Sequence, residues 1–138
     1  MKDVVDAIYD RLGSSTGSGS FHNLVDGRYY HMEAPQNIGF PHCVYALDPV
    51  DNANQYGGTR ILTGAITFDI YCVARLGAAA AMDIEEALFT LLDQQELAGV
   101  GSTYGIASMQ CLVRGVPSVT DEFIVITTTY SIFTTRIA

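Results

Sequence analysis

The feature that most constrains the fold of this sequence is a long segment, Arg60–Ala74, in which apolar and polar side chains alternate. Its apolar members share one face of an extended chain: Leu62, Ile66, Phe68, Ile70 and Cys72. The other face carries Thr63, Thr67, Asp69 and Tyr71. A period of two is typical of a β-strand with one buried face, so the segment predicts a half-buried strand of a sheet.

Two segments follow the helical period instead. The first runs from Asp3 to Leu12 and ends at Gly13, a residue that favours helix termination. The second covers about Ala78–Gln94, with an apolar stripe of Ala81, Ile84, Leu88, Leu91 and Gln95, widened by Ala87 and Leu92. Its acidic residues Asp83, Glu85 and Glu86 lie off this stripe. We expect this helix to pack on the apolar face of Arg60–Ala74.

Further strands are indicated by β-branched and aromatic residues between turn formers. They are expected at Arg28–Glu33, about His42–Leu47, about Tyr104–Arg114 and Glu122–Thr135, with a turn around Gly115–Ser118 joining the last two. Loops are predicted at Ser14–Ser20 and Asp48–Gly58. The second loop is unusually long for a compact domain, and such loops are often functional. The pattern therefore gives an α+β fold of about five strands and two helices.

The last strand is apolar on both of its faces. Ile124, Ile126, Tyr130 and Ile132 form one row, and Phe123, Val125 and Phe133 belong to the other. Two helices can cover one face of a sheet, so the second row, together with Tyr71 and Val73, needs another cover. Either loops fold over these residues or they form a subunit interface.

Composition narrows the class of protein. The chain has 138 residues, of which 49% are hydrophobic and 16% charged, which fits one folded domain spanning residues 1–138. Its net charge of −8 argues against a surface that coats nucleic acid, because neutralising phosphates requires clustered Lys and Arg. We identify no transmembrane helix or secretory signal, so the expected site of synthesis and folding is the cytoplasm.

No pattern of catalytic residues stands out. Phosphate-loop, dinucleotide, acyl-transfer and zinc-protease motifs are absent from the sequence. The nearest match, His31-Met32-Glu33, lacks the downstream cysteine pair that a zinc deaminase needs. The other histidines, His22 and His42, have no evident partner, and Cys43, Cys72 and Cys111 are expected to be buried free thiols. We therefore expect a binding or structural protein without enzymatic activity, cofactor or metal.

The order of several short motifs is more specific. The segments 24–30 (LVDGRYY), 34–36 (APQ) and 40–45 (FPHCVY) follow an N-terminal helix that contains Ala7-Ile8-Tyr9. Later in the chain, segment 67–77 (TFDIYCVARLG) precedes an Ala-rich helix. Segment 130–136 (YSIFTTR) ends the last strand. In this order, over nearly the whole chain, the sequence resembles the tail-completion proteins of long-tailed bacteriophages, also called tail terminators or tail-to-head joining proteins. Members occur in prophages and gene transfer agents as well.

The resemblance implies an α+β fold with one antiparallel sheet and two helices on one face, assembled as a ring, typically of six copies. Such a ring caps the tail tube, stops its polymerisation and joins it to the neck of the head. The expected location is therefore the tail–neck junction of a virion. DNA would pass through the ring without specific binding, and an acidic lumen would keep it from adhering.

These expectations name an interface and its partners. The candidate interface residues are Tyr56, Arg60, Asp69, Tyr71, Arg114, Phe123, Val125 and Phe133. The partners are further copies of this chain, a tail tube protein and a head–tail connector or neck protein, with no membrane. The segments Asp48–Arg60 and Arg114–Glu122 are expected to contact the other virion proteins, and deletion of residues 51–57 is expected to spare folding but impair particle assembly.

Two alternative functions remain open from the sequence. The chain could be a different head–tail connector or tube component with the same small domain. It could also be a small enzyme or ligand-binding module whose site uses residues that no motif marks.

Overall fold

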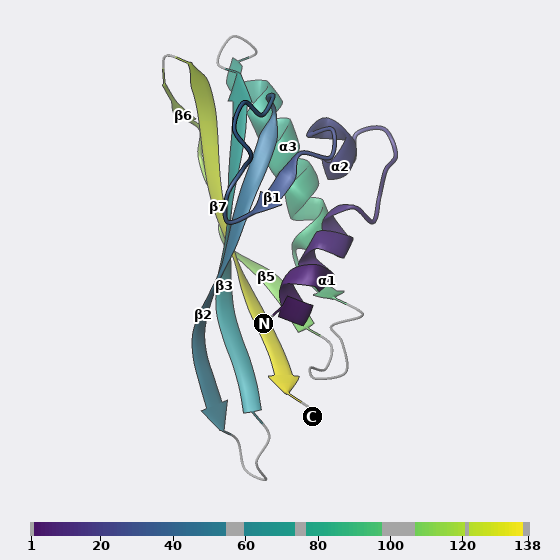
Figure 1. Ribbon diagram of the computed structural model, residues 1–138, viewed down its shortest axis with the longest axis vertical. Helices are drawn as coiled ribbons and strands as arrows, with labels where there is room; N and C mark the ends of the chain where they lie inside the picture. Colours follow the sequence, from purple (N-terminus) through teal and green to yellow (C-terminus); the bar gives the residue numbers. More distant parts are fainter. Residues whose placement is uncertain (1, 55–59, 74–76, 98–106, 121, 137–138) are drawn as a thin grey trace.

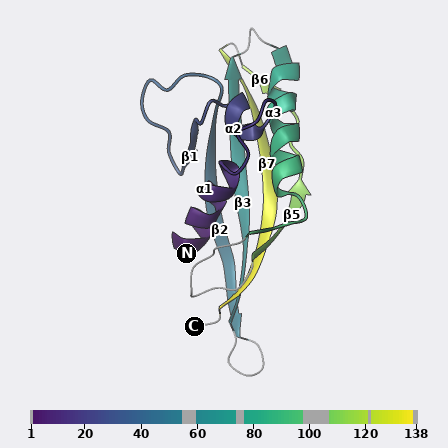
Figure 2. The ribbon, with the colours of Figure 1, turned by 90° about the vertical axis from the view of Figure 1, so that its right-hand side faces the viewer.

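Within residues 2–54, 60–73, 77–97, 107–120 and 122–136, which the computed structural model describes, seven strands form one twisted sheet and three helices lie along one of its faces (Figures 1 and 2). The helices are α1 (Lys2–Leu12), α2 (Phe21–Leu24) and α3 (Gly77–Leu92). The strands are β1 (Tyr29–His31), β2 (His42–Asn54), β3 (Arg60–Val73), β4 (Gln95–Leu97), β5 (Ala107–Val113), β6 (Ser118–Val119) and β7 (Phe123–Arg136). We call the helix-covered side of the sheet the inner face and the opposite side the outer face.

β3 and β7 form the centre of the sheet, whose strand order is β1-β2-β3-β7-β5-β4, with β6 also pairing with β7. The two strands pair antiparallel from Val73 opposite Phe123 to Arg60 opposite Arg136. The alternation in Arg60–Ala74 is confirmed over its described part, because Ile66, Phe68, Ile70 and Cys72 are all buried under the helices. On β7 the predicted inner row is likewise buried: Ile124, Ile126, Tyr130 and Ile132.

The positions of the helices agree with most of the helical pattern predicted from the sequence. α1 and α3 match the two predicted segments within two residues at each end, and α3 packs against β3 and β7. α2 was not predicted, because a helix of four residues is too short to show a period; Ser20 caps it by accepting a hydrogen bond from the Asn23 N–H. The placement of Glu85 off the buried stripe was wrong, since only 6% of Glu85 is exposed.

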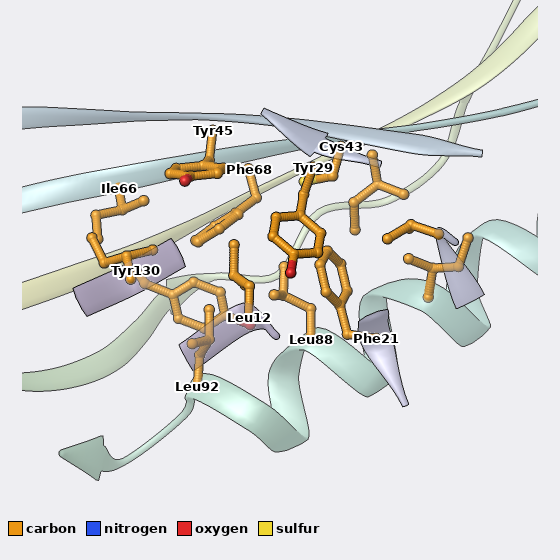
Figure 3. Close-up of a cluster of buried hydrophobic side chains, with 14 of the residues drawn as sticks. Leu12, Phe21, Tyr29, Cys43, Tyr45, Ile66, Phe68, Leu88, Leu92 and Tyr130 are labelled. Atoms are coloured by element: carbon orange, nitrogen blue, oxygen red, sulfur yellow. The ribbon is translucent and has the colours of Figure 1, made fainter. Parts of the chain in front are cut away.

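One aromatic and aliphatic core joins the two layers (Figure 3). Tyr45, Phe68 and Tyr130 point down from the sheet, and their rings follow one another with centroid separations of 5.6 and 5.7 Å. From the helices, Leu12, Phe21, Leu88 and Leu92 fill the space below them. The helices are also tied together, because the Arg11 guanidinium donates two hydrogen bonds of 3.1 Å to the Leu91 carbonyl at the end of α3. Positive charge at this helix end is favourable.

The prediction of a loop at Asp48–Gly58 was wrong over its described part. β2 continues to Asn54 and pairs with β3 down to the Asn54–Arg60 pair, with a register shift between Pro49 and Asp51. Pro, Asp and Asn disfavour strands, but β3 supplies a full hydrogen-bonding partner, and an edge strand tolerates proline. Residues 55–58 lie outside the described residues. Deleting residues 51–57 would remove part of β2, so the expectation that folding is spared no longer holds.

The sheet is mixed rather than antiparallel. β1 pairs parallel with β2, from Tyr29 opposite Cys43 to His31 opposite Tyr45. The expectation of about five strands was too low because β4 and β6, of three and two residues, are too short to alternate visibly. Of the predicted strand Tyr104–Arg114, residues 104–106 lie outside the described residues, and Ser118, expected in the turn, begins β6.

The lower half of β2, β3 and β7 extends past the helices as a three-stranded arm (Figure 1). No helix of the described residues is both long and apolar enough to cross a lipid bilayer.

Candidate assembly interface

The outer face of the sheet carries an apolar patch that the described helices do not cover, because all of them lie on the inner face (Figure 2). We define the patch by six residues that are half-buried or exposed: Phe40, Val44, Tyr71, Val73, Phe123 and Val125. Five of these are outward positions of β2, β3 and β7. Tyr71 pairs with Val125 and Val73 with Phe123, while Val44 pairs with Asp69, two residues along β3 from Tyr71. The patch is therefore contiguous across the centre of the sheet.

Four rings gather at one end of this patch and form an aromatic cluster: Phe40, His42, Tyr71 and Phe123. The His42 ring stacks on Tyr71 with centroids 4.9 Å apart and ring planes at 16°. Phe40, from the segment before β2, lies 5.1 Å from His42 and stacks on Phe123 at 6.4 Å. Two of these ring pairs are stacked and two are tilted, and aromatic contacts of both kinds stabilise the arrangement of the side chains.

The environment of His42 keeps the cluster uncharged near neutral pH. Burial lowers the pKa of the His42 imidazole, and the nearby Arg28 cation adds to the effect, while the hydrogen-bonding contact between Nδ1 and the Gly39 carbonyl, 3.1 Å away, opposes it. Burial likewise raises the pKa of the Tyr71 phenol, and the Asp69 carboxylate contributes in the same direction. Both side chains are therefore neutral at pH 7, which suits an apolar contact surface.

The carboxylate beside the patch already has one hydrogen-bond partner. Asp69 Oδ1 accepts a hydrogen bond of 2.6 Å from the Thr127 hydroxyl on the neighbouring strand. The predicted place of Asp69 on the face opposite the buried row is confirmed, and Asp69 is half-buried there. Because Thr127 already supplies one hydrogen bond, covering Asp69 would cost less than covering an unpaired carboxylate.

Of the remaining predicted interface residues, Phe133 lies apart from the patch. Phe133 is on the outer face and 46% exposed, but it is ten residues along β7 from Phe123, or about 33 Å at ~3.3 Å per residue. It borders a separate hollow of about 330 Å³, lined also by residues of β4 and β5. Tyr56 lies outside the described residues, and only the backbone of Arg60, the first residue of β3, is described. The structure thus brings together Asp69, Tyr71, Phe123 and Val125, and it separates Phe133 from them.

Arg114 is engaged within the chain. Its Nε and Nη2 donate to both carboxylate oxygens of Glu85 at 2.9 and 2.6 Å, and Nη2 also donates to Glu86 at 2.6 Å. The guanidinium carbon lies 4.0 Å above the Phe89 ring. These contacts raise the pKa of Arg114 further and explain why Glu85 can be buried in α3. The connection after β5 is therefore fastened to α3.

Gly115 fastens the same connection to the sheet. A Cβ atom at this position would overlap the Thr127 carbonyl oxygen of β7, so the backbone approaches β7 as closely as glycine allows. Beyond it, Val116 and Val119 are 80% and 67% exposed. A firmly held connection thus presents apolar side chains at the end of the molecule where β6 and the start of α3 lie (Figure 1).

Within the described ranges, no group of three His, Cys, Asp or Glu residues is placed to hold a metal ion. The three histidines lie in separate surroundings: His22 contacts the Tyr29 hydroxyl, His31 lies against the Tyr45 ring, and His42 belongs to the aromatic cluster. Cys43 and Cys72 are buried free thiols as predicted, and Cys111 is only half-buried. Burial raises the pKa of all three thiols, which keeps them protonated and poorly nucleophilic.

Comparison with solved structures relates this arrangement to a known fold. A chain from the virion of a native gene transfer agent particle superposes with a TM-score of 0.70 at 15% identity, over 93% of this chain and 91% of that chain. The chain shares the fold of a virion component. A second solved protein gives a TM-score of 0.70 at 10% identity, over 99% of this chain and 96% of that one. No protein-family model and no curated protein sequence matches the chain.

Sequence reasoning missed three members of the patch and its aromatic cluster, Phe40, His42 and Val44. The alternation at the start of β2 could have found two of them, since Cys43 and Tyr45 face the core and their neighbours must face outward. Phe40 precedes the strand, so no periodicity marks it.

Proposed function

We propose that this chain is a structural protein of a phage-type particle, a tail terminator whose copies form a ring that caps the tail tube and joins it to the neck. The observation that carries the proposal is the apolar patch on the outer face. Covering it with another chain removes apolar surface from water, at about 25 cal/mol per Å². The virion chain with the same fold and the order of the tail-completion motifs support the particle context.

A second copy of this chain fits the patch better than it fits the helical side. With a net charge of −8, copies repel one another unless they meet through a surface poor in carboxylates. The helical layer exposes acids along α1 and α3: Asp6, Asp10, Asp83 and Glu86. On the patch side, Asp69 is hydrogen-bonded to Thr127. Charge therefore favours association through the outer face.

The other contacts of the ring follow from what the molecule presents at its two ends. The arm of β2, β3 and β7 projects past the helices at one end, and the connection with Val116 and Val119 lies at the other (Figure 1). We assign these ends to the tail tube protein and the neck protein, without deciding which end meets which. DNA passes through the ring without a specific site, since only seven Lys and Arg residues are spread over the chain.

Association is tested with the Phe123→Asp variant, which places a charge in the aromatic cluster of the patch. Sedimentation velocity and mass measurement of the purified protein should show assembly weakened at least about tenfold, equal to ~1.4 kcal/mol. Met82→Asp, which adds the same charge at an exposed site of α3 on the helical side, is the matched control and should assemble like the parent.

The capping function is tested by adding each protein to polymerising tail tube protein and measuring tube lengths by electron microscopy. The parent should limit tube growth and Phe123→Asp should not, even if the parent forms its ring only on the tube. Tubes that the variant caps as well as the parent would contradict the proposed interface. Tubes that neither protein caps would contradict the terminator function.

A further inference from the structure

The free edge of β2 carries a further inference, which does not depend on the proposed ring. β2 pairs with β3 along its length, but on its other side β1 covers only Cys43, Val44 and Tyr45. Within the described residues, no strand pairs with that side from Ala46 to Asn54. At ~3.3 Å per residue this edge is about 30 Å long. An open edge of this length is a template for a strand of another chain and a route to uncontrolled growth.

Two hydrogen bonds establish which residues face the free edge. The Cys43 N–H donates to the Arg28 carbonyl, and the Tyr45 carbonyl accepts from the Met32 N–H, both at 2.8 Å on the β1 side. Main-chain groups of alternate residues point to the same side of a strand. Continuing down the strand, Leu47 and Pro49 therefore direct their main-chain groups at the free edge.

Pro49 interrupts the edge at this point, because proline has no N–H to donate. Directly after it, the register with β3 shifts between Pro49 and Asp51, which inserts one extra residue into β2. Asp51 then pairs with Thr63, so Asn52 and Asn54 become the residues that face the edge. A strand that paired with this edge of β2 would lack the hydrogen bond from residue 49. Directly after it, the bulge would interrupt the regular spacing of the main-chain hydrogen-bonding groups.

Charge adds a second obstacle at the same place. Asp48, which is exposed, and Asp51 flank the interruption. If the β2 edges of two copies paired antiparallel around this segment, Asp48 and Asp51 of one copy would lie close to the same residues of the other. Like charges in directly opposed strand positions are destabilising.

We propose that Pro49 and the bulge after it prevent β2 from pairing with β2 of a second copy of this chain. The device stops the sheet from growing from copy to copy through this edge. A chain with a long open edge needs such protection, since edge-to-edge addition has no natural end.

The test restores the missing donor with Pro49→Val in the Phe123→Asp background, where association through the patch is weakened. The concentration at which half of the protein sediments as larger species should fall at least about tenfold relative to that background. Pro35→Val, at an exposed proline outside the strands, is the matched control and should leave it unchanged. Adding Asn52→Pro to Pro49→Val removes a donor from the same edge and should reverse the association.

A second measurement locates the contact. Amide hydrogen exchange at Leu47 should slow with rising concentration of Pro49→Val, but not of Pro35→Val. The proposal is wrong if Pro49→Val sediments like the control, or if larger species form while Leu47 exchanges as in the parent. It is also wrong if both Pro49→Val and Pro49→Ala lose their far-ultraviolet circular dichroism, since Pro49 would then be needed for folding itself.

Discussion

The two faces of the central strands differ although alternate residues of the same strands build them. On the inner face, Phe68 and Ile70 are completely buried by helices of the same chain. On the outer face, Tyr71, between Ile70 and Cys72, is only half-buried, and the described helices leave it uncovered. One face is therefore completed by folding, whereas the other keeps apolar surface that the described helices do not cover.

The largest expected effect separates the two faces directly. Phe68→Ala should lower the free energy of unfolding by about 3–5 kcal/mol, because it leaves a cavity under the helices. Phe123→Ala should cost about 1 kcal/mol or less in the unassociated protein, since its ring is only partly buried. Urea denaturation at low protein concentration measures both. Equal losses would mean that the chain buries its outer face by itself.

A smaller effect is expected where the connection after β5 is fastened to the helical layer. Glu85→Gln should lower the free energy of unfolding by about 1–3 kcal/mol, because the buried carboxylate accepts two charged hydrogen bonds from Arg114. Glu86→Gln, the neighbouring exposed acid that contacts the same guanidinium, should change it by less than about 0.5 kcal/mol. Thermal and urea unfolding compare them. Similar values would show that burial of Glu85 adds nothing.

The smallest effect concerns pH and the aromatic cluster. The pKa of His42 is lower in the folded protein than in the unfolded chain, so the unfolded state binds the proton more readily. The parent should therefore lose stability as pH falls below about 6.5, the ordinary histidine pKa. His42→Phe should lack this part of the loss, so the difference in unfolding free energy between variant and parent should grow from pH 7.5 to 5. A constant difference would contradict the burial of a neutral His42.

Sequence patterning predicted the elements whose burial is local and periodic. Arg60–Ala74 and the last strand keep a period of two over many residues, so their inner and outer rows follow from the order of the residues alone. The segment after Leu47 could not be assigned, because its residue types favour loops and only pairing with β3 makes them a strand. Short elements such as β4, β6 and α2 contain too few residues to display a period.

The candidate interface was predictable only in part for a related reason. Phe123, Val125 and Tyr71 were predictable because strands with apolar residues on both faces can be covered by the helices on one face only. Phe40 joins them through a contact between distant segments, which no local pattern encodes. Arg114 was assigned from its place in a turn, whereas its binding to Glu85 depends on how β5 meets α3. The parallel pairing of β1 also depends on the path of the chain rather than on its composition.

The position of β7 has a consequence for how complete molecules are selected. It is the last described strand in chain order, yet it occupies the middle of the sheet between β3 and β5. A chain still on the ribosome, or one broken off before Phe123, lacks this central strand. The edge of β3 that pairs with β7 would then have no hydrogen-bonding partner. Truncated products would therefore lack a completed sheet and be open to degradation, which amounts to quality control by topology alone.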